Sequence, residues 1–292
     1  ARDKRSRSNF FFRKDRTAYR IFSFGVSAVY YAAALTRVTI DFPRRARYTY
    51  VMNDNAEKIK ELKNMLNVSR SAVFFGGAGV SVPSGIPDFR SPDGLAGRKY
   101  KYPFETILSH DFFFTHTREF WDYFFAELDI PGAAPNAAHL ALAELEKRGK
   151  LKAVITQNID GLHQAAGSRT VYELHGTASR AHCVGCGKEY TAADVRGLRP
   201  LPTCGCGGLI KPDVVLYGEQ LPEREVEGAC EALAEADLVI VGGTSLSVYP
   251  AASFLRLTRG RVAVINKTPT LSSPVTPDLE IVGDITLLTE LL

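Results

Sequence analysis

The chain alternates between short apolar runs and amphipathic stretches over most of its length. Apolar residues recur at helical spacing over 54–66, 136–148 and 223–235. Strand-like apolar runs occupy 72–75, 153–156, 238–241, 262–265 and 279–282. Apolar strands that alternate with helices are typical of a parallel sheet covered on both faces. The pattern therefore predicts an α/β fold built on a mostly parallel sheet.

Two stretches interrupt this alternation. Residues 97–130 are rich in aromatic side chains and predict helices, whereas 180–212 holds four of the five cysteines. Two close cysteine pairs separated by a short excursion have the spacing of a tetrahedral zinc site. Four thiolates leave no open coordination position, so such a zinc would be structural. Four unrelated buried thiols are the alternative. The fifth cysteine, Cys230, is expected in the core. The four candidate ligands are Cys183, Cys186, Cys204 and Cys206.

Basic charge is concentrated at the N-terminal end. Residues 1–51 hold 12 of the 36 Lys and Arg but 3 of the 32 Asp and Glu, so the rest of the chain is net acidic. The basic balance therefore gives no argument for nucleic-acid binding by the body of the protein. A zinc ribbon acting with the basic leader remains a hypothesis of a different class, a nucleic-acid-binding module. No apolar run approaches the roughly 18 residues of a membrane-spanning helix.

The first methionine of the chain is Met52, and three interpretations of the basic leader at 1–51 are open. Its Arg-rich start and apolar stretch fit a cleaved signal or transit peptide, which would direct the protein to an organelle. A genuine basic arm is the second interpretation. We favour a non-native upstream extension with translation starting at Met52, because an amphipathic helix follows at once. A cytoplasmic location is then expected.

Two glycine-containing segments directly follow strand-like runs. Residues 77–79 would bring backbone N–H groups close to a pyrophosphate, although Val82 stands where the dinucleotide fingerprint has its third glycine. Residues 88–90 add a cation that can pair with phosphate, and an aromatic wall. Residues 243–245 offer hydroxyls and amides to a phosphate. Ordinary loop or strand-to-helix turn chemistry is the alternative for each glycine segment.

Polar side chains follow two further strand-like runs. Ligands of open α/β sheets bind outside the carboxyl ends of the strands, so Gln157, Asn158 and Asp160 are placed to hydrogen-bond a ligand. Asn266 and Lys267 end another strand, where ribose hydroxyls could be bound. Helix capping by Asn158 or Asp160 is the structural alternative.

A histidine at position 175 precedes a glycine. Histidine titrates near neutrality and therefore suits a general base. The residue pattern alone gives no reason to prefer His175 over the other five histidines of the chain.

Taken together, these segments resemble the sirtuin family of NAD-dependent protein deacylases, of the bacterial deacetylase type. The resemblance extends from about residue 58 to the end of the chain and rests on the order of its motifs. They are GAGxS with GIPDFRS, TQNIDGLH, HG, the four cysteines, KPDVVLYGE, GTSLxVYP and INK.

The resemblance implies a catalytic domain over 52–292, in which a Rossmann-like large domain carries a small domain from inserts at about 97–130 and 180–212. NAD⁺ would be consumed as a co-substrate, and the four cysteines would hold one structural zinc. His175 would be the general base, with Asn158 also catalytic at the nicotinamide end. The residues implied for NAD⁺ binding are Gly77, Ala78, Gly79, Asp88, Phe89, Arg90, Gln157, Asn158, Asp160, Gly243, Thr244, Ser245, Asn266, Lys267 and Ile285.

The resemblance also implies acyl-lysine proteins or peptides as the second substrate. Residues 214–218 and 248–250 would sandwich the peptide as an added β-strand, with contacts from Val215, Tyr217 and Val248. The acyl group would pass to ADP-ribose as nicotinamide is released. Family members that prefer acidic acyl groups carry a Tyr-x-x-Arg pair that this sequence lacks, so acetyl or a longer neutral acyl group is expected.

Two departures from the family pattern stand out. Gly76 occupies a position where the family commonly has Thr, with little expected consequence. The second cysteine pair is Cys-x-Cys rather than Cys-x2-Cys, which tightens the chelate. An NAD-dependent protein mono-ADP-ribosyltransferase, using the same NAD⁺ pocket, is the alternative activity.

Overall fold

The structure is a computed structural model that describes residues 44–89, 91, 94–270 and 273–292. The chain forms two units, 1–52 and 53–292. Most of the basic leader expected over 1–51 lies outside the described residues. Helix α2 (Arg44–Val68) begins before the predicted start at 54. No helix in the described part of the chain is long and apolar enough to span a membrane.

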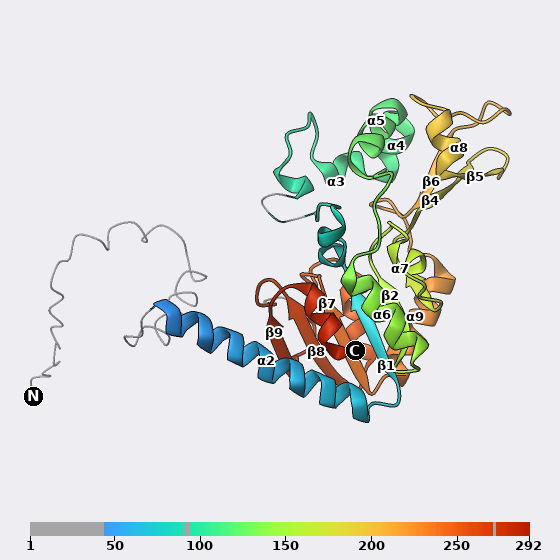
Figure 1. The fold of residues 1–292 in the computed structure, drawn as a ribbon. Coiled ribbons are helices and arrows are strands. Elements are labelled where there is room, and N and C mark those ends of the chain that lie inside the picture. The colour runs from blue at the N-terminus through green and yellow to red at the C-terminus, as the bar shows by residue number, and fades with distance from the viewer. Residues whose placement is uncertain (1–43, 90, 92–93, 271–272) are drawn as a thin grey trace, which may run out of the picture. The chain divides into compact units, whose positions relative to one another are not determined.

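Six parallel strands form the main sheet of the 53–292 unit, in the order β3-β2-β1-β7-β8-β9 (Figure 1). This confirms the predicted parallel α/β fold. Strand β3 was not predicted, because it is a short strand whose residues are only partly buried. The strands are β1 (Ala72–Gly76), β2 (Leu151–Thr156), β3 (Val171–Glu173), β7 (Leu238–Gly242), β8 (Arg261–Asn266) and β9 (Leu279–Val282).

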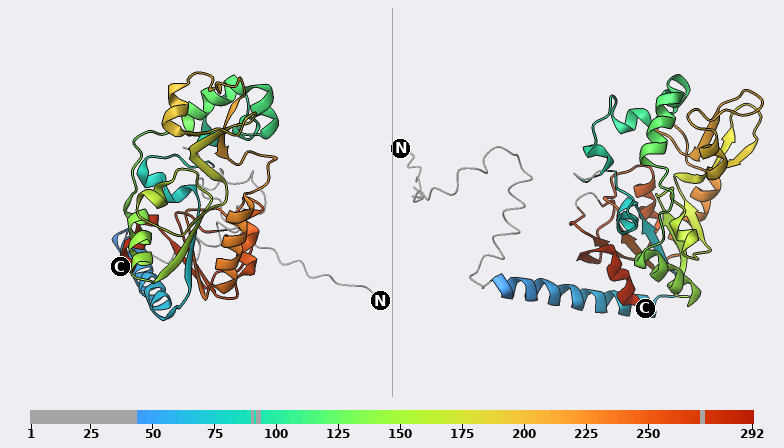
Figure 2. Two further views of the ribbon diagram at one scale, coloured as in Figure 1. Left: turned by 90° about the vertical axis from the view of Figure 1, so that its right-hand side faces the viewer. Right: turned by 45° about the horizontal axis from the view of Figure 1, so that its top comes forward.

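Helices cover both faces of this sheet (Figure 2). Alternate residues of β1 point to opposite sides, so Phe74 lies in one core cluster and Phe75 in the other. Burial on both faces explains why β1 is an unbroken apolar run. The Phe74 side is covered by α2, α6 (Ala137–Lys147) and η5 (Ile285–Leu291), and the Phe75 side by α9 (Glu223–Glu235) and η4 (Ala251–Leu257).

A third core cluster holds together the two stretches that interrupt the alternating pattern. Trp121 and Phe113 from the aromatic stretch pack in it with Cys183 and Cys204 from the cysteine segment. We call this part the small module. Its elements are α3 (Phe104–Ile107), α4 (His110–Thr115), α5 (Thr117–Glu127), α8 (Ala192–Gly197) and the antiparallel strands β4 (Gly176–Cys183), β5 (Glu189–Thr191) and β6 (Ile210–Val214).

The strand register brings the ends of the central strands to one edge of the sheet. Gly76, the last residue of β1, pairs with Thr156 of β2 on one side and Gly242 of β7 on the other. The loops that follow these strands therefore start side by side. The loops after β1 and β2 lead into the short elements η1 (Ala78–Val80), η2 (Val82–Ser84) and α7 (Leu162–Ala165).

Candidate active site

The glycine loops after β1 and β7 pack backbone against backbone. The N–H of Gly77 donates to the carbonyl of Gly242 at 3.2 Å, and that of Gly79 to Gly243 at 2.8 Å. A Cβ on Gly79 would lie 2.7 Å from the Cα of Gly243, whose own φ is +62°. Glycine is therefore needed at both positions. These two N–H groups hold the loops together, so other groups of the loop must meet a phosphate.

Hydrogen bonds join three of the predicted cofactor-binding residues. Gln157 Nε2 donates to Thr244 Oγ1 at 3.3 Å. Asn266 Oδ1 accepts from the Thr244 N–H at 3.1 Å, and its Nδ2 donates to the Thr244 carbonyl at 2.9 Å. Asn266 thus brackets the loop after β7 from the end of β8. Lys267 Nζ lies 3.7 Å from Asp284 Oδ2, and the exposed lysine remains open to a ligand.

Two other predicted residues have different surroundings. Ser245 is exposed, with its Oγ 2.7 Å from Ser247 Oγ. Ile285 lies in the core, where its Cδ1 is 2.5 Å from the position of a Cβ on Gly242. The core placement of Ile285 leaves little of its side chain for contact with a ligand.

His175 lies between β3 and β4, and its Nδ1 is 2.9 Å from the Gln157 carbonyl oxygen. A carbonyl oxygen only accepts, so Nδ1 carries the proton and Nε2 of the neutral ring keeps its lone pair. Burial lowers the pKa of His175, and the hydrogen bond to Gln157 partly opposes this effect. The ring is therefore neutral at neutral pH, with Nε2 able to accept a proton.

The Ser81 hydroxyl lies at the centre of a buried polar cluster. It donates to Asp160 Oδ2 at 2.6 Å and accepts from Asn158 Nδ2 at 3.0 Å. His139 Nε2 is 3.5 Å from the same hydroxyl, while its Nδ1 accepts from the Asn136 N–H at 3.3 Å. The proton of neutral His139 therefore sits on Nε2, which points at Ser81. The Ser81 hydroxyl proton goes to Asp160, and the Ser81 oxygen accepts from Asn158 and faces the N–H of His139. These contacts fix the orientations of the Asn158 and Asp160 side chains.

The contacts of Asn158 and Asp160 also show whether either side chain caps a helix, the structural alternative to ligand binding. Asp160 Oδ1 accepts from the Leu162 N–H at 2.9 Å, so Asp160 does stabilise the start of α7. Asn158 directs its amide to Ser81 instead. Sequence reasoning missed Ser81 and His139 as site residues. The GAGxS motif contains Ser81 and could have signalled it, whereas His139 lies in an apolar helix and gave no signal.

A further histidine, His163, lies beside His139, with the ring centroids 4.8 Å apart. Burial lowers the pKa of His163 to about 3. Neither ring nitrogen of His163 has a hydrogen-bond partner among the described residues. The ring is therefore neutral in the native protein over the whole physiological range.

The predicted residues Asp88 and Phe89 lie next to the small module. Asp88 Oδ1 accepts from the Ser91 N–H at 2.7 Å. Phe89 packs against the small-module core, with its ring centroid 5.9 Å from that of Phe104. The third predicted residue of this segment, Arg90, lies outside the described residues.

The segment predicted to hold the peptide leaves β6 and passes close to His175. The Val215 N–H donates to the His175 carbonyl at 2.9 Å. Tyr217 exchanges backbone hydrogen bonds with Leu108 and His110, and its side chain is exposed. Val248, from the other predicted peptide segment, is half-buried.

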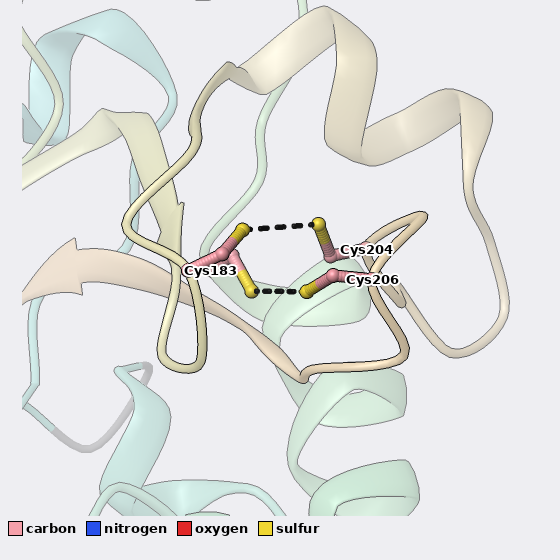
Figure 3. A group of neighbouring side chains, drawn as sticks. Cys183, Cys204 and Cys206 are labelled. Carbon is pink, nitrogen blue, oxygen red and sulfur yellow. Dashed lines mark hydrogen bonds between the residues drawn. The ribbon is translucent and has the colours of Figure 1, made fainter.

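The four cysteines of the small module form one cluster, and Figure 3 labels three of them, Cys183, Cys204 and Cys206. Their sulfur atoms all lie within 4.8 Å of one another, with Cys183–Cys206 at 3.5 Å and Cys186–Cys204 at 3.6 Å. A tetrahedral zinc with Zn–S bonds of about 2.3 Å has sulfur atoms about 3.8 Å apart. The cluster therefore fits one four-coordinate zinc ion, and the Cys-x-Cys spacing is compatible with it.

Residues 77–250 match the profile of the Sir2 family. An NAD-dependent protein deacetylase from Clostridium acetobutylicum is 51% identical over 219 residues, which cover 73% of this chain and 89% of that protein. One from Thermotoga maritima is 45% identical over 219 residues, covering 72% of this chain and 87% of that protein.

Solved structures show the same likeness. One is a Sir2 with a p53 peptide and NAD⁺, with a TM-score of 0.73, 39% identity, and coverage of 80% of this chain and 95% of that one. A Sir2 variant with deacetylated p53 peptide and 3′-O-acetyl ADP ribose has a TM-score of 0.74 at 40% identity, covering 80% and 96%. Since a family profile matches more than half of the chain and its relatives share about half of the aligned residues, the chain belongs to the Sir2, or sirtuin, family.

Proposed function

We propose that this chain is an NAD-dependent protein lysine deacetylase, which transfers the acyl group to ADP-ribose and releases nicotinamide. The position of His175 carries the proposal. Its side chain bonds to Gln157, a predicted NAD⁺ residue, and its carbonyl bonds to Val215, a predicted peptide residue. One residue with a free basic nitrogen thus connects the two predicted substrate sites. The activities named for the relatives agree with this.

In the proposed mechanism, the acyl oxygen of the substrate would bond to the ribose carbon of NAD⁺ as the bond from that carbon to nicotinamide breaks. Nicotinamide would leave with the electron pair of that bond, which neutralises its ring charge. Asn158 and Asp160, fixed by Ser81, hydrogen-bond the nicotinamide end. His175 Nε2 would accept the proton of a ribose hydroxyl, whose oxygen bonds to the acyl carbon. The bond from the acyl carbon to the lysine nitrogen then breaks, lysine leaves as the free amine, and one water molecule adds at the acyl carbon to complete O-acyl-ADP-ribose. Phe89, held against the small-module core, excludes water from the reacting centre.

The proposed second substrate is an acyl-lysine protein or peptide. Val215, Tyr217 and Val248 are the residues we assign to its binding, as an added β-strand that is recognised chiefly through its backbone. A neutral acyl group, acetyl first, is proposed. Solved relatives contain acetylated and propionylated peptides, which supports this choice.

The proposed organisation is a catalytic domain over 52–292 with the small module as its second part. Cys183, Cys186, Cys204 and Cys206 would hold one structural zinc, closed to substrates by its four thiolates. All four thiols are free of disulfides, which fits a reducing compartment such as the proposed cytoplasm.

The test is nicotinamide release by the full chain from NAD⁺, with and without an acetyl-lysine peptide. The proposal expects release that requires the acetylated peptide and yields O-acetyl-ADP-ribose by mass spectrometry. Release without the peptide would favour ADP-ribosyl transfer or NAD⁺ hydrolysis instead. Absence of release with acetyl, propionyl and longer neutral acyl peptides would contradict the proposal.

A further inference from the structure

We infer that Glu127 is a positioning residue, which docks the segment carrying Asp88 and Phe89 onto the small module and so favours NAD⁺ binding. The NAD⁺ part of this inference rests on the proposed function. The docking itself rests on contacts among described residues alone, and it can be tested without NAD⁺.

Glu127 is the last residue of α5, and it is buried, with 6% of its surface exposed. Its two carboxylate oxygens contact Arg98 Nη1 and the Tyr100 hydroxyl. Both partners lie on the segment after η3 (Leu95–Gly97), outside α5. Among the described residues, Arg98 is the one ion-pair partner of this carboxylate.

Short backbone hydrogen bonds connect these contacts to the predicted cofactor residues. The Leu95 N–H donates to the Asp88 carbonyl at 2.8 Å, and the Ala96 N–H to the Phe89 carbonyl at 3.0 Å. Arg98 follows Ala96 by two positions. If Arg98 moves away from Glu127, the backbone at Leu95 and Ala96 therefore moves too, and with it the hydrogen bonds that hold Asp88 and Phe89.

Aromatic packing adds to the docking. The ring of Tyr100 makes an edge contact with that of Tyr123, at a centroid separation of 4.8 Å. Tyr123 is buried, and burial together with the nearby charge of Glu127 raises its pKa, so it stays neutral. Tyr123 therefore offers no charge to balance Glu127.

The consequence is that undocking is unfavourable. If Arg98 and Tyr100 leave, the Glu127 carboxylate loses its ion-pair partner and the tyrosine hydroxyl that donates to it. Hydrogen bonds to a charged group are stronger than those between neutral groups, so this loss is unfavourable. The contact thus orders Asp88 and Phe89 before NAD⁺ arrives and reduces the ordering that binding must impose.

The chain offers a matched control two positions away. The side chain of Asp129 is 8% exposed, against 5% for that of Glu127, and its carboxylate pairs with Arg196 at 2.7 Å and Arg199 at 3.1 Å. Those arginines lie on or just after α8, away from the Asp88 segment. Glu127→Gln and Asp129→Asn therefore make the same chemical change, and Glu127→Gln alone loosens the docking.

Two readouts on the full chain separate the inference from the proposed function. Without NAD⁺, hydrogen exchange at the Leu95 and Ala96 amides should be faster in Glu127→Gln than in wild type, and unchanged in Asp129→Asn. In steady-state deacetylation, Glu127→Gln should raise the KM for NAD⁺ by about tenfold, with kcat within about twofold. Asp129→Asn should leave this KM unchanged.

Further variants keep the test decisive if Glu127→Gln fails to fold, as judged by the fluorescence of Trp121, the single tryptophan. Tyr100→Phe removes one hydroxyl and should shift both readouts in the same direction by less. Arg98→Met removes the same ion pair from the other side and should raise the KM for NAD⁺ on its own. Where Glu127→Gln folds, the two changes should be non-additive in KM, because they remove one shared contact.

Unchanged exchange and unchanged KM in the folded variants would overturn the inference. An equal change in Asp129→Asn would do the same. A wild-type chain without deacetylase activity would remove the proposed function, while the exchange experiment would still decide the docking.

Discussion

The Nδ1 atom of His175 donates a hydrogen bond to the carbonyl oxygen of Gln157 at 2.9 Å. This single contact sets the tautomer of the ring and leaves Nε2 as the basic atom. It also places that base against the loop directly after β2, which carries Gln157 and Asn158. The chemistry proposed for the chain follows from this arrangement.

The pKa of His175 sets the first prediction, on the pH dependence of deacetylation. Burial lowers this pKa below its ordinary value of 6.5, so the unprotonated base persists to lower pH. We expect the acidic limb of kcat/KM to be centred below pH 6.5. A pH profile with an acetylated peptide measures this. An acidic limb centred above 6.5 would contradict the assignment of His175 as a buried base.

Ser81 carries the second prediction. Ser81→Ala leaves Asp160 Oδ2 without the hydroxyl and releases the Asn158 amide. We expect kcat/KM to fall by about 10- to 100-fold, with a stability loss of about 1–3 kcal/mol for the unpaired buried groups. Ser84→Ala is the control, because its hydroxyl accepts from Asn136 Nδ2 and lies outside the cluster. Full activity in Ser81→Ala would show that the cluster is only structural.

Zinc content gives the third prediction. Cys206→Ala should lose the metal and loosen the small module, because a closed thiolate site contributes folding energy. Trp121, packed in that module, reports the loss as a fluorescence shift. Cys230→Ala, on α9, should keep about one zinc per chain. A metal-free Cys206→Ala protein with native fluorescence and activity would contradict the structural role.

His163 determines the fourth prediction, on acid stability. Below about pH 6.5 the unfolded chain binds a proton at this residue, whereas the native ring does so only near pH 3. Stability is therefore lost as pH falls through this window, with a slope of up to about 1.4 kcal/mol per pH unit. His163→Leu should flatten this dependence in denaturant titrations. Leu145→Ala is the control, because Leu145 of α6 lies in the same core cluster as Phe74, whose ring centroid is 6.3 Å from that of His163. It should lower stability without changing the slope.

Much of the fold was predictable from sequence because its strands are buried on both faces. The run at 279–282 matches β9 residue for residue, and β1 differs from its prediction only by the added Gly76. Strand β3 escaped because three partly buried residues give too weak a pattern. The predicted start of helix α2 at residue 54 is too late, because a helical pattern of apolar residues does not mark where a helix starts.

The candidate site was predictable where it follows strands and hidden where it depends on tertiary contacts. Gln157, Thr244 and Asn266 each follow or end a strand, and hydrogen bonds bring them together. The contact between Ser81 and His139 joins residues 58 positions apart, which no local pattern encodes. The segment 77–79 was predicted to offer its N–H groups to a pyrophosphate, but those of Gly77 and Gly79 bind the neighbouring loop.

The most direct test of the account replaces His175 by alanine and measures deacetylation and NAD⁺ binding in the same preparation. We predict that the deacetylation rate falls by about 100-fold or more, as expected for loss of a general base, while the Kd for NAD⁺ changes by less than about threefold. Retained turnover in His175→Ala would contradict the assignment of the base and, with it, the proposed mechanism.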